Sequence, residues 1–418
     1  MRVAHISSHD TFGGAARAAL RLHKGLQAAG IDSTMLVHEK SSDDQSVLGP
    51  VSNIAKGIAH FRTSIDHIPK LFYPNRKPTT YHFQWLPDYL IRKIKALKPH
   101  IVHLHWICRG FVNIRSLARI EQPMVWTLHD MWPFTGGCHF AGKCERYIQV
   151  CGECPQLASK RKRDLSWWTW QRKAKQWHDL NLKLAAPSRW MKRCAQQSSL
   201  FNTAPIDVIP YGINNSRFSP RDRAAARKLI GLTRNKKLIL FGAVNATSDK
   251  RKGFDFLLPA LRQIAASETG NQTECVVFGA SKPSAPTDFG LKTTYLGPLH
   301  DELSLSLVYR ASDVFVAPSR EDNLPNTIME ALSCGLPCVA FNVGGIPEMI
   351  EHKISGYIAD PFDTETLAKG IAWVLEKEPR WRILSTAARK KAEDEYDIKT
   401  VTKRYTDLYQ SVLGDRKF

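Results

Sequence analysis

Short apolar runs recur along the chain, each closed by glycine, proline or a polar residue, and this pattern predicts buried β-strands. The clearest runs are residues 3–7, 125–130, 238–244, 274–279, 313–317 and 336–341. Between them lie longer stretches with apolar residues every three or four positions, such as residues 14–27 and 89–97, which are typical of amphipathic helices. Strands that alternate with helices predict an α/β fold built on parallel sheets.

Length and charge narrow the possible classes of protein. A chain of 418 residues is too long for one ordinary core and suits two domains. Its 59 Lys and Arg residues against 39 Asp and Glu give a net charge of +20. That charge indicates an anionic partner, such as nucleic acid, an acidic membrane leaflet or a phosphorylated substrate. Because no apolar run approaches the roughly 18 residues of a membrane span, and the first residues resemble a strand rather than a secretory signal, we expect a cytoplasmic protein.

One stretch of the second half combines a helix start with acidic residues. Residues 313–348 predict, in order, a strand, a polar loop, a helix, a second strand and a Gly-Gly turn. The loop carries two adjacent acids, Glu321 and Asp322. Pro325 suits a first helical position, and Gly335 closes the helix. Since ligands of open α/β sheets bind at the carboxyl ends of strands, we expect the two acids to line a binding site.

The spacing of polar residues in this stretch fits a sugar nucleotide. The first N–H groups of the helix, near Asn326 and Thr327, form an anion site suited to a phosphate. Glu330 lies one helical turn further along the same face, within reach of a ribose, and Asp322 is placed to accept from other hydroxyls. The alternative is an ordinary strand–helix–strand unit with a solvated Glu-Asp turn.

The same stretch resembles the nucleotide-sugar signature of the family 4 retaining glycosyltransferases, which have the GT-B fold. That signature is an acid, seven residues, Glu-Ala, Gly-x-Pro and a Gly-Gly turn, and it reads here as Asp322, Glu330-Ala331, Gly335-Leu-Pro337 and Gly344-Gly345. The resemblance implies that Glu330 binds the ribose and that Asp322 contacts the donor sugar, with Glu321 as its substitute. It adds four donor-binding residues: Asn323, Leu324, Asn326 and Thr327.

Other motifs of the family follow in the family's order. The glycine-rich loop after the first strand resembles the family's first loop and implies that Gly14 lies near the donor diphosphate or the acceptor. The strand that ends in His129 resembles the strand–His motif of the active centre, where a histidine hydrogen-bonds the donor sugar. The alternative for His129 is a histidine satisfied within its loop.

A basic turn completes the donor site that the resemblance implies. Lys252 and Gly253 match the family's lysine before a glycine, so that Lys252 neutralises the departing diphosphate. The arginine that the family carries just after a strand glycine is absent, because Ala243 stands there, and Arg251 is the expected substitute. Gly279 matches a loop beside the nucleotide base. Composition alone favours an exposed basic turn.

The resemblance also implies how the chain divides. It predicts an acceptor-side Rossmann-like domain over 1–204 and a nucleotide-sugar-binding domain over 205–395, with the two domains facing a cleft. A final helix within 396–418 is expected to cross back onto the first domain.

Four cysteines crowd into residues 138–154 of the first domain. They are Cys138, Cys144, Cys151 and Cys154, the last two in a Cys-x-x-Cys pair. Four thiolates at such spacing close a tetrahedral structural zinc site; two disulfides or four reduced thiols are the alternatives. The segment around them resembles the exopolysaccharide branch of the family, which includes colanic acid transferases.

Residues 160–177 mix basic side chains with Trp167, Trp168, Trp170 and Trp177. This mixture is typical of an interfacial segment on an anionic membrane, and it fits an acceptor linked to polyprenyl diphosphate. Nucleic-acid binding uses similar residues. The third alternative is a solvated helix whose tryptophans pack on the core.

These features together predict a retaining hexosyltransferase of exopolysaccharide or lipopolysaccharide synthesis, peripheral on the inner face of the plasma membrane. Its donor is a UDP- or GDP-sugar and its acceptor a lipid-linked oligosaccharide. The resemblance implies that catalysis requires no cofactor. The cysteine spacing makes any zinc structural, and we expect no nucleic-acid partner, because such a partner leaves the paired acids and the two sheet domains unexplained. The alternatives are an epimerase or hydrolase of nucleotide sugars with the same fold, and a basic zinc-containing nucleic-acid-binding protein.

Overall fold

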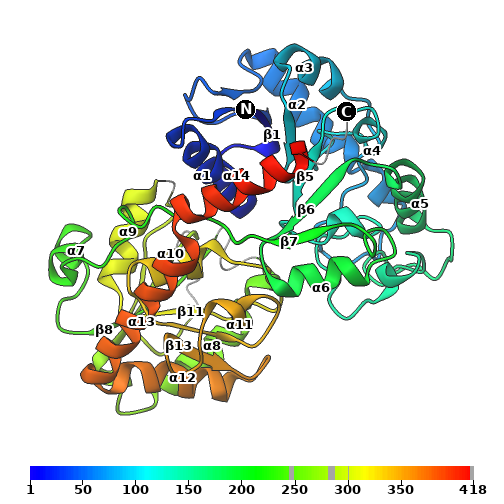
Figure 1. Cartoon of the computed structure of the whole chain (residues 1–418). Helices are drawn as coiled ribbons and strands as arrows, with labels where there is room; N and C mark the ends of the chain where they lie inside the picture. The colour runs from blue at the N-terminus through cyan, green and yellow to red at the C-terminus, as the bar shows by residue number, and fades with distance from the viewer. Residues whose placement is uncertain (244–248, 281–287, 300, 415–418) are drawn as a thin grey trace. The chain divides into compact units, whose positions relative to one another are not determined.

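The computed structural model describes residues 1–243, 249–280, 288–299 and 301–414 (Figure 1). The chain forms two compact units, one of Met1–Pro210 with Val401–Phe418 and one of Tyr211–Thr400. Both unit boundaries therefore lie a few residues beyond the predicted ones. Val244, predicted to end a strand, lies outside the described residues.

The first unit is built on a seven-stranded parallel sheet in the order β3-β2-β1-β4-β5-β6-β7. Its strands are β1 Arg2–His9, β2 Asp32–Glu39, β3 Val47–Leu48, β4 Ile101–Leu104, β5 Met124–Thr127, β6 Leu182–Ala186 and β7 Ile206–Val208. The strand order reverses between β1 and β4. Loops that follow those two strands therefore border the crevice where such sheets bind ligands.

Six α-helices of the first unit lie within its N-terminal segment: α1 Gly14–Ala28, α2 Asn53–Asp66, α3 Leu90–Leu97, α4 Ile114–Leu117, α5 Leu165–Trp177 and α6 Arg189–Gln197. Short polar residues begin several of them. The Asp164 carboxylate accepts from the N–H groups of Ser166 and Trp167 at the start of α5, and the Ser188 hydroxyl accepts from Met191 N–H in α6. These caps satisfy N–H groups that have no partner within the helix.

The last helix, α14 Ile398–Gly414, packs on the first unit's sheet. Its buried residues Tyr405 and Tyr409 join a core with Ile101 and Val125. Their hydroxyls bond into the sheet, Tyr409 to His103 Nδ1 at 2.6 Å and Tyr405 to Thr127 Oγ1 at 2.8 Å. The predicted return of the C-terminal helix to the first domain is thus confirmed.

The second unit is built on a six-stranded parallel sheet in the order β10-β9-β8-β11-β12-β13. Its strands are β8 Lys237–Gly242, β9 Thr273–Phe278, β10 Thr293–Tyr295, β11 Val314–Ala317, β12 Cys338–Phe341 and β13 Gly356–Ala359. Its helices are α7 Arg223–Leu229, α8 Phe254–Ala265, α9 Glu302–Ala311, α10 Asn326–Ser333, α11 Ile346–Met349, α12 Thr364–Glu376 and α13 Glu378–Tyr396. Here the order reverses between β8 and β11, so the loops after these strands border the second unit's crevice.

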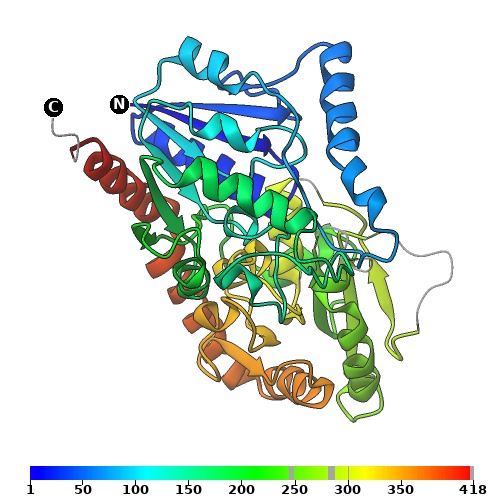
Figure 2. The same cartoon turned by 90° about the vertical axis from the view of Figure 1, so that its right-hand side faces the viewer.

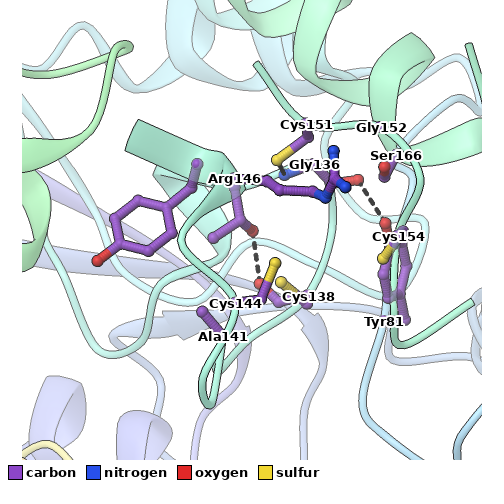
Figure 3. Close-up of a pocket in the computed structure, with 12 residues that line it drawn as sticks. Tyr81, Gly136, Cys138, Ala141, Cys144, Arg146, Cys151, Gly152, Cys154 and Ser166 are labelled. Carbon is purple, nitrogen blue, oxygen red and sulfur yellow. Dashed lines mark hydrogen bonds between the residues drawn. The ribbon is translucent and has the colours of Figure 1, made fainter. Parts of the chain in front are cut away.

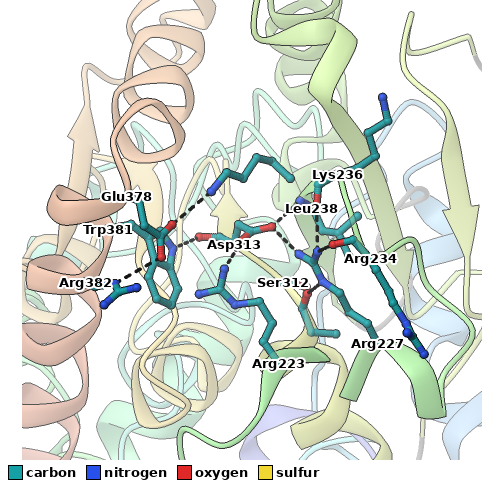
Figure 4. Close-up of polar contacts among 12 residues, drawn as sticks. Arg223, Arg227, Arg234, Lys236, Leu238, Ser312, Asp313, Glu378, Trp381 and Arg382 are labelled. Carbon is teal, nitrogen blue, oxygen red and sulfur yellow. Dashed lines mark hydrogen bonds and ion pairs between the residues drawn. The ribbon is translucent and has the colours of Figure 1, made fainter. Parts of the chain in front are cut away.

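Asp313, just before β11, ties several segments of the second unit together (Figure 4). Its carboxylate contacts Arg223 and accepts from Arg227 Nη2 at 2.6 Å and from the Leu238 N–H at 2.7 Å. Its backbone carbonyl accepts from the Trp381 indole N–H at 2.6 Å. The Asp313 side chain is 1% exposed, so the carboxylate that neutralises the arginines is buried away from water.

We expect Asp313→Asn to lower the free energy of unfolding by about 3–5 kcal/mol, because two arginines lose a buried counter-charge. Urea unfolding followed by circular dichroism measures the change. The control is Glu378→Gln, which removes a half-exposed partner of Lys237 and should cost about 1 kcal/mol or less. Equal losses in the two variants would contradict the role given to Asp313.

Within the described residues, no helix combines the length and the apolar character needed to cross a membrane.

Candidate active site

Two loops meet at the crevice of the second unit, one after β8 and one after β11. The first carries the short helix η4 Lys250–Lys252, and its Arg251 carbonyl accepts from the Arg320 N–H of the second loop at 2.8 Å. Gly253 has φ +72° and lies so close to the second loop that a Cβ would stand 1.8 Å from the Pro318 oxygen. The loops therefore touch through backbone, and only glycine fits at position 253.

The Asp322 carboxylate joins the two loops through ion pairs. Its Oδ2 lies 2.7 Å from Lys252 Nζ and 3.2 Å from Arg251 Nη1, and its Oδ1 accepts from the Asn323 N–H at 3.1 Å. Burial by itself raises the pKa of the Asp322 carboxyl, but the charges of Lys252 and Arg251 outweigh it, so the pKa lies below the ordinary value. The structure thus brings three predicted residues together as a buried carboxylate with two cations.

The Gly-Gly turn fixes the loop that carries Asp322. The Gly345 N–H donates to the Asp322 carbonyl at 3.1 Å. Gly344 has φ +58°, and a Cβ there would stand 1.9 Å from the same carbonyl oxygen. The turn predicted from sequence therefore acts as the support of the acidic loop.

Helix α10 follows the acidic loop and carries Glu330 on a buried face. The Glu330 side chain is 1% exposed, and its Oε2 accepts from the Tyr309 hydroxyl at 3.0 Å. Asn326 and Thr327 are half-buried in the first turn. Pro325 precedes the helix as its cap instead of occupying the first helical position as predicted.

The remaining predicted residues of the second unit lie around these loops. Asn323 and Leu324, which lie between Asp322 and α10 in the sequence, are both buried. Glu321 is half-buried, and its carbonyl accepts from Arg251 Nη1 at 3.2 Å. Gly279 directly follows β9, and its N–H donates to the Gly297 carbonyl at 2.8 Å. All of them belong to the same unit as Glu330 and Lys252.

Gly14 and His129 belong to the first unit, after the carboxyl ends of β1 and β5, which are separated in the sheet by β4. Gly14 begins α1 after β1, and His129 follows β5. Asp10 shapes the loop before Gly14, because its carboxylate accepts from the N–H groups of Thr11, Ser41 and Ser42 at 2.8–3.1 Å. The two predicted residues thus lie at one edge of one sheet, as ligand-binding residues of such sheets do.

Sequence reasoning missed a chain of histidines behind His129. His129 Nε2 lies 3.0 Å from His105 Nδ1, and His105 Nε2 lies 2.9 Å from His5 Nδ1. Burial lowers the pKa of His129 to about 4 and holds those of His5 and His105 well below the ordinary value. All three rings are therefore neutral near pH 7. The alternation of His103 and His105 in the sequence indicated that the two share one face of a strand. It could not reveal the chain, because the partners of His105 lie on or after other strands.

A second polar chain starts at the residue after His129. The Asp130 carboxylate lies 2.6 Å from His139 Nδ1 and accepts from the Trp106 indole at 2.8 Å, while His139 Nε2 lies 2.8 Å from His82 Nδ1. Burial raises the pKa of Asp130, but His139 and the hydrogen bonds outweigh it and leave the pKa lowered. This chain anchors the loop that carries His129.

All four predicted zinc-ligand cysteines line one small pocket of the first unit, beside Tyr81 and Gly136 (Figure 3). All four are free thiols. The Gly136 N–H donates to Cys151 Sγ at 3.1 Å. Among the described residues, the sets whose ligand atoms lie within 4.8 Å of one another are His5, His103 and His105, and His82, Cys108 and His139. Most of these histidine nitrogens already take part in hydrogen bonds, so we assign no ion to either set.

The tryptophans predicted to enter a membrane differ in their surroundings. Trp177 is buried between Trp126 and Trp132, with ring centroids 5.3 and 6.1 Å away, and its indole N–H donates to the Ile114 carbonyl at 2.9 Å. For Trp177 the membrane interpretation was wrong, because α5 packs that side of the helix into the core. Trp168, on the opposite side, is exposed.

Each unit of the chain matches a family of glycosyltransferases. Residues 12–217 match the family described as "Glycosyltransferase Family 4", and residues 235–377 match "Glycosyl transferases group 1". The chain belongs to family 4 of the glycosyltransferases. The first match includes strands β2 to β7, and the second includes strands β8 to β13.

Curated relatives and solved structures extend this comparison. D-inositol 3-phosphate glycosyltransferase of Mycolicibacterium smegmatis is 31% identical over 296 residues, which are 67% of this chain and 60% of that protein. The same enzyme of Segniliparus rotundus is 30% identical over 193 residues, 44% of this chain and 42% of that protein. The chain spans about half the length of the first curated relatives it matches.

The solved structures establish the fold. Sucrose-phosphate synthase from Thermosynechococcus elongatus has a TM-score of 0.70 at 18% identity and covers 99% of both chains. WaaG, a glycosyltransferase involved in lipopolysaccharide biosynthesis, has a TM-score of 0.65 at 18% identity, covering 97% of this chain and 99% of its own. The GT-B fold expected from the sequence is therefore confirmed for this family 4 member.

Proposed function

We propose that this protein transfers a hexose from a UDP- or GDP-sugar to a glycan acceptor and retains the configuration of the anomeric carbon. The observation that carries the proposal is the buried Asp322 carboxylate, held by Lys252 and Arg251 in the loop that leads into α10. Cations, a helix N-terminus and the buried Glu330 provide partners for a diphosphate, a ribose and a sugar hydroxyl.

In this proposal each residue acts on one part of the donor. Glu330 accepts from the ribose hydroxyls, while Lys252 and the first N–H groups of α10 take the charge of the departing diphosphate. Asp322 keeps the lysine in place and accepts from the sugar, and His129 is proposed as a hydrogen-bond donor to a sugar hydroxyl. Arg251 adds a second cation beside the phosphates.

The transfer itself needs no nucleophile from the protein. The acceptor oxygen forms a bond to the anomeric carbon on the face from which the phosphate oxygen leaves. The acceptor hydroxyl proton passes to that phosphate oxygen, and a nucleoside diphosphate departs. Charge stabilisation by Lys252 and α10 is thus the main contribution of the chain, and no cofactor takes part in this scheme.

The acceptor in this proposal is a growing oligosaccharide on polyprenyl diphosphate, in exopolysaccharide or lipopolysaccharide synthesis at the inner face of the plasma membrane. The net charge of +20 supports an anionic surface as the working environment. A zinc-containing nucleic-acid-binding protein would leave the buried acids of the second sheet unexplained.

A thermal-shift panel tests donor recognition. We expect the nucleoside diphosphate of the true donor, at about 100 times its dissociation constant, to stabilise the protein by about 2.7 kcal/mol, a rise in melting temperature of a few degrees. Nucleosides without phosphate should give no shift, because the cations then have no partner. Product analysis without acceptor separates transfer from hydrolysis or epimerisation. No shift with any UDP or GDP compound would contradict the proposal.

A further inference from the structure

Helix α2 and the short helix η1 Ile68–Phe72 expose their large apolar side chains. Of the twenty exposed large hydrophobic residues within the described part of the chain, seven fall in residues 51–72. They are Val51, Ile54, Ile58, Phe61, Ile68, Leu71 and Phe72, and we call them the α2–η1 face. Figure 2 shows α2, in blue, on the outside of the first unit.

The amphipathic pattern of α2 is the reverse of that of an ordinary surface helix. Its buried residues are Ala59, Thr63 and Asp66, which are small or polar. Ile54 and Phe61 point the other way and are 79% and 65% exposed. An apolar stripe directed outward marks a surface that meets an apolar partner.

The charge around the α2–η1 face identifies the partner. Residues 51–77 contain five basic residues, Lys56, Arg62, Lys70, Arg76 and Lys77. The single acidic residue of this segment, Asp66, is buried. A second copy of the chain would bring these positive charges together, whereas an anionic lipid surface attracts them and accepts the apolar side chains.

We propose that the α2–η1 face docks this protein on an anionic lipid bilayer, with its apolar side chains in the interface and the exposed basic residues Lys56, Arg76 and Lys77 at the headgroups. The inference does not depend on the donor site. It moves the membrane contact from the tryptophans of residues 160–177 to the segment where the exposed apolar side chains gather.

Sedimentation with lipid vesicles tests the docking. We expect the full chain to bind vesicles with about one third phosphatidylglycerol at least tenfold more tightly than pure phosphatidylcholine, and to lose this preference at high salt. The triple variant Ile54→Ser, Ile58→Ser, Phe61→Ser should lose at least tenfold in binding. Because these side chains are exposed, its melting temperature should match the wild type.

Matched controls keep the test specific. Leu229→Ser and Ile383→Ser replace equally exposed apolar residues elsewhere, and Trp168→Ala removes the exposed tryptophan of α5; all three should bind like the wild type. Unchanged binding of the triple variant, or loss of binding in Trp168→Ala alone, would overturn the proposal. The proposal would also be overturned if light scattering showed a dimer for the wild type and a monomer for the triple variant, since the face would then bind a second copy.

A separate observation carries a second proposal, at the four-cysteine pocket. Residues 128–164 contain, among the described elements, only the two short helices η2 Trp132–Phe134 and η3 Arg146–Ile148. Long segments with so little regular structure are uncommon in compact domains, and a bound metal ion is one way to hold them in one conformation. No disulfide supplies one, because all four thiols are free.

We infer that this pocket binds one structural zinc ion through Cys138, Cys144, Cys151 and Cys154. Zinc would hold the four sulfurs about 3.8 Å from one another. In the described structure no three of them lie within 4.8 Å of one another. The Gly136 N–H at Cys151 Sγ and the Arg146 side chain at the pocket suit the negative charge of four thiolates. The ion would fix the loop that holds His139 against Asp130.

Elemental analysis of protein purified under reducing conditions tests this site. We expect about one zinc per chain, released by four equivalents of a mercurial, in the wild type and in the control Cys194→Ser. Cys151→Ser should lose most of the metal. Wild-type protein without zinc, whose four thiols react with Ellman's reagent while folded or are found in disulfides, would overturn the assignment.

Discussion

Replacing Lys252 by alanine should lower kcat/KM by about 100- to 1000-fold, because the charge of the departing diphosphate loses its nearest cation. The loss should appear in kcat more than in KM, since the charge develops in the transition state. Assays with a radiolabelled donor, chosen by the thermal-shift panel, measure it.

The fold should survive Lys252→Ala, because Arg251 still pairs with Asp322 when the lysine side chain is removed. Lys369→Ala, an exposed lysine of the same unit on α12, is the control and should keep wild-type turnover. Wild-type turnover in Lys252→Ala would contradict the role proposed for this residue, as would an equal loss in Lys369→Ala.

The second large effect should appear when the pH falls. Burial lowers the pKa of several histidines of the first unit, among them these seven: His5, His23, His38, His82, His103, His105 and His129. In the unfolded chain each titrates near 6.5, so below that pH the unfolded state binds protons that the folded state refuses. Stability is therefore full above about pH 6.5 and is lost as the pH falls toward 4.

Each of these histidines should cost about 1.4 kcal/mol at pH 5.5, one pH unit below its unfolded value. Seven together approach about 10 kcal/mol, which is as large as the whole stability of many proteins. We expect urea midpoints to drop steeply between pH 6.5 and 5.5. His38→Gln should flatten this slope, whereas His60→Gln, at an exposed position, should not. A midpoint that stays constant over this range would contradict the account.

Local pattern predicted the parts of the site that lie close together in sequence. The strand, acidic loop and helix around Asp322 and Glu330 follow from apolar runs, proline and glycine within one stretch, so their order was readable. The contact of Asp322 with Lys252 joins residues at the ends of different strands. The family motifs placed both residues at the donor site, but the sequence did not predict the contact between them. The fold brings the two motifs together, so that Lys252 and Asp322 form an ion pair.

Other features depended on contacts that no local pattern contains. His5, His105 and His129 follow or lie on three strands, and their chain exists only because β1, β4 and β5 are neighbours. The tryptophans of residues 160–177 misled us in part, because composition does not show that Trp177 faces Trp126. Helix α2 was not predicted from the sequence, and only the burial of its residues shows that its apolar stripe faces outward.

The structure of a complex with the donor tests the central claim most directly. The account predicts ribose hydroxyls within hydrogen-bonding distance of the Glu330 carboxylate, with the diphosphate against the first N–H groups of α10 and beside Lys252. A donor bound away from α10, or one that leaves Glu330 and Asp322 untouched, would contradict it.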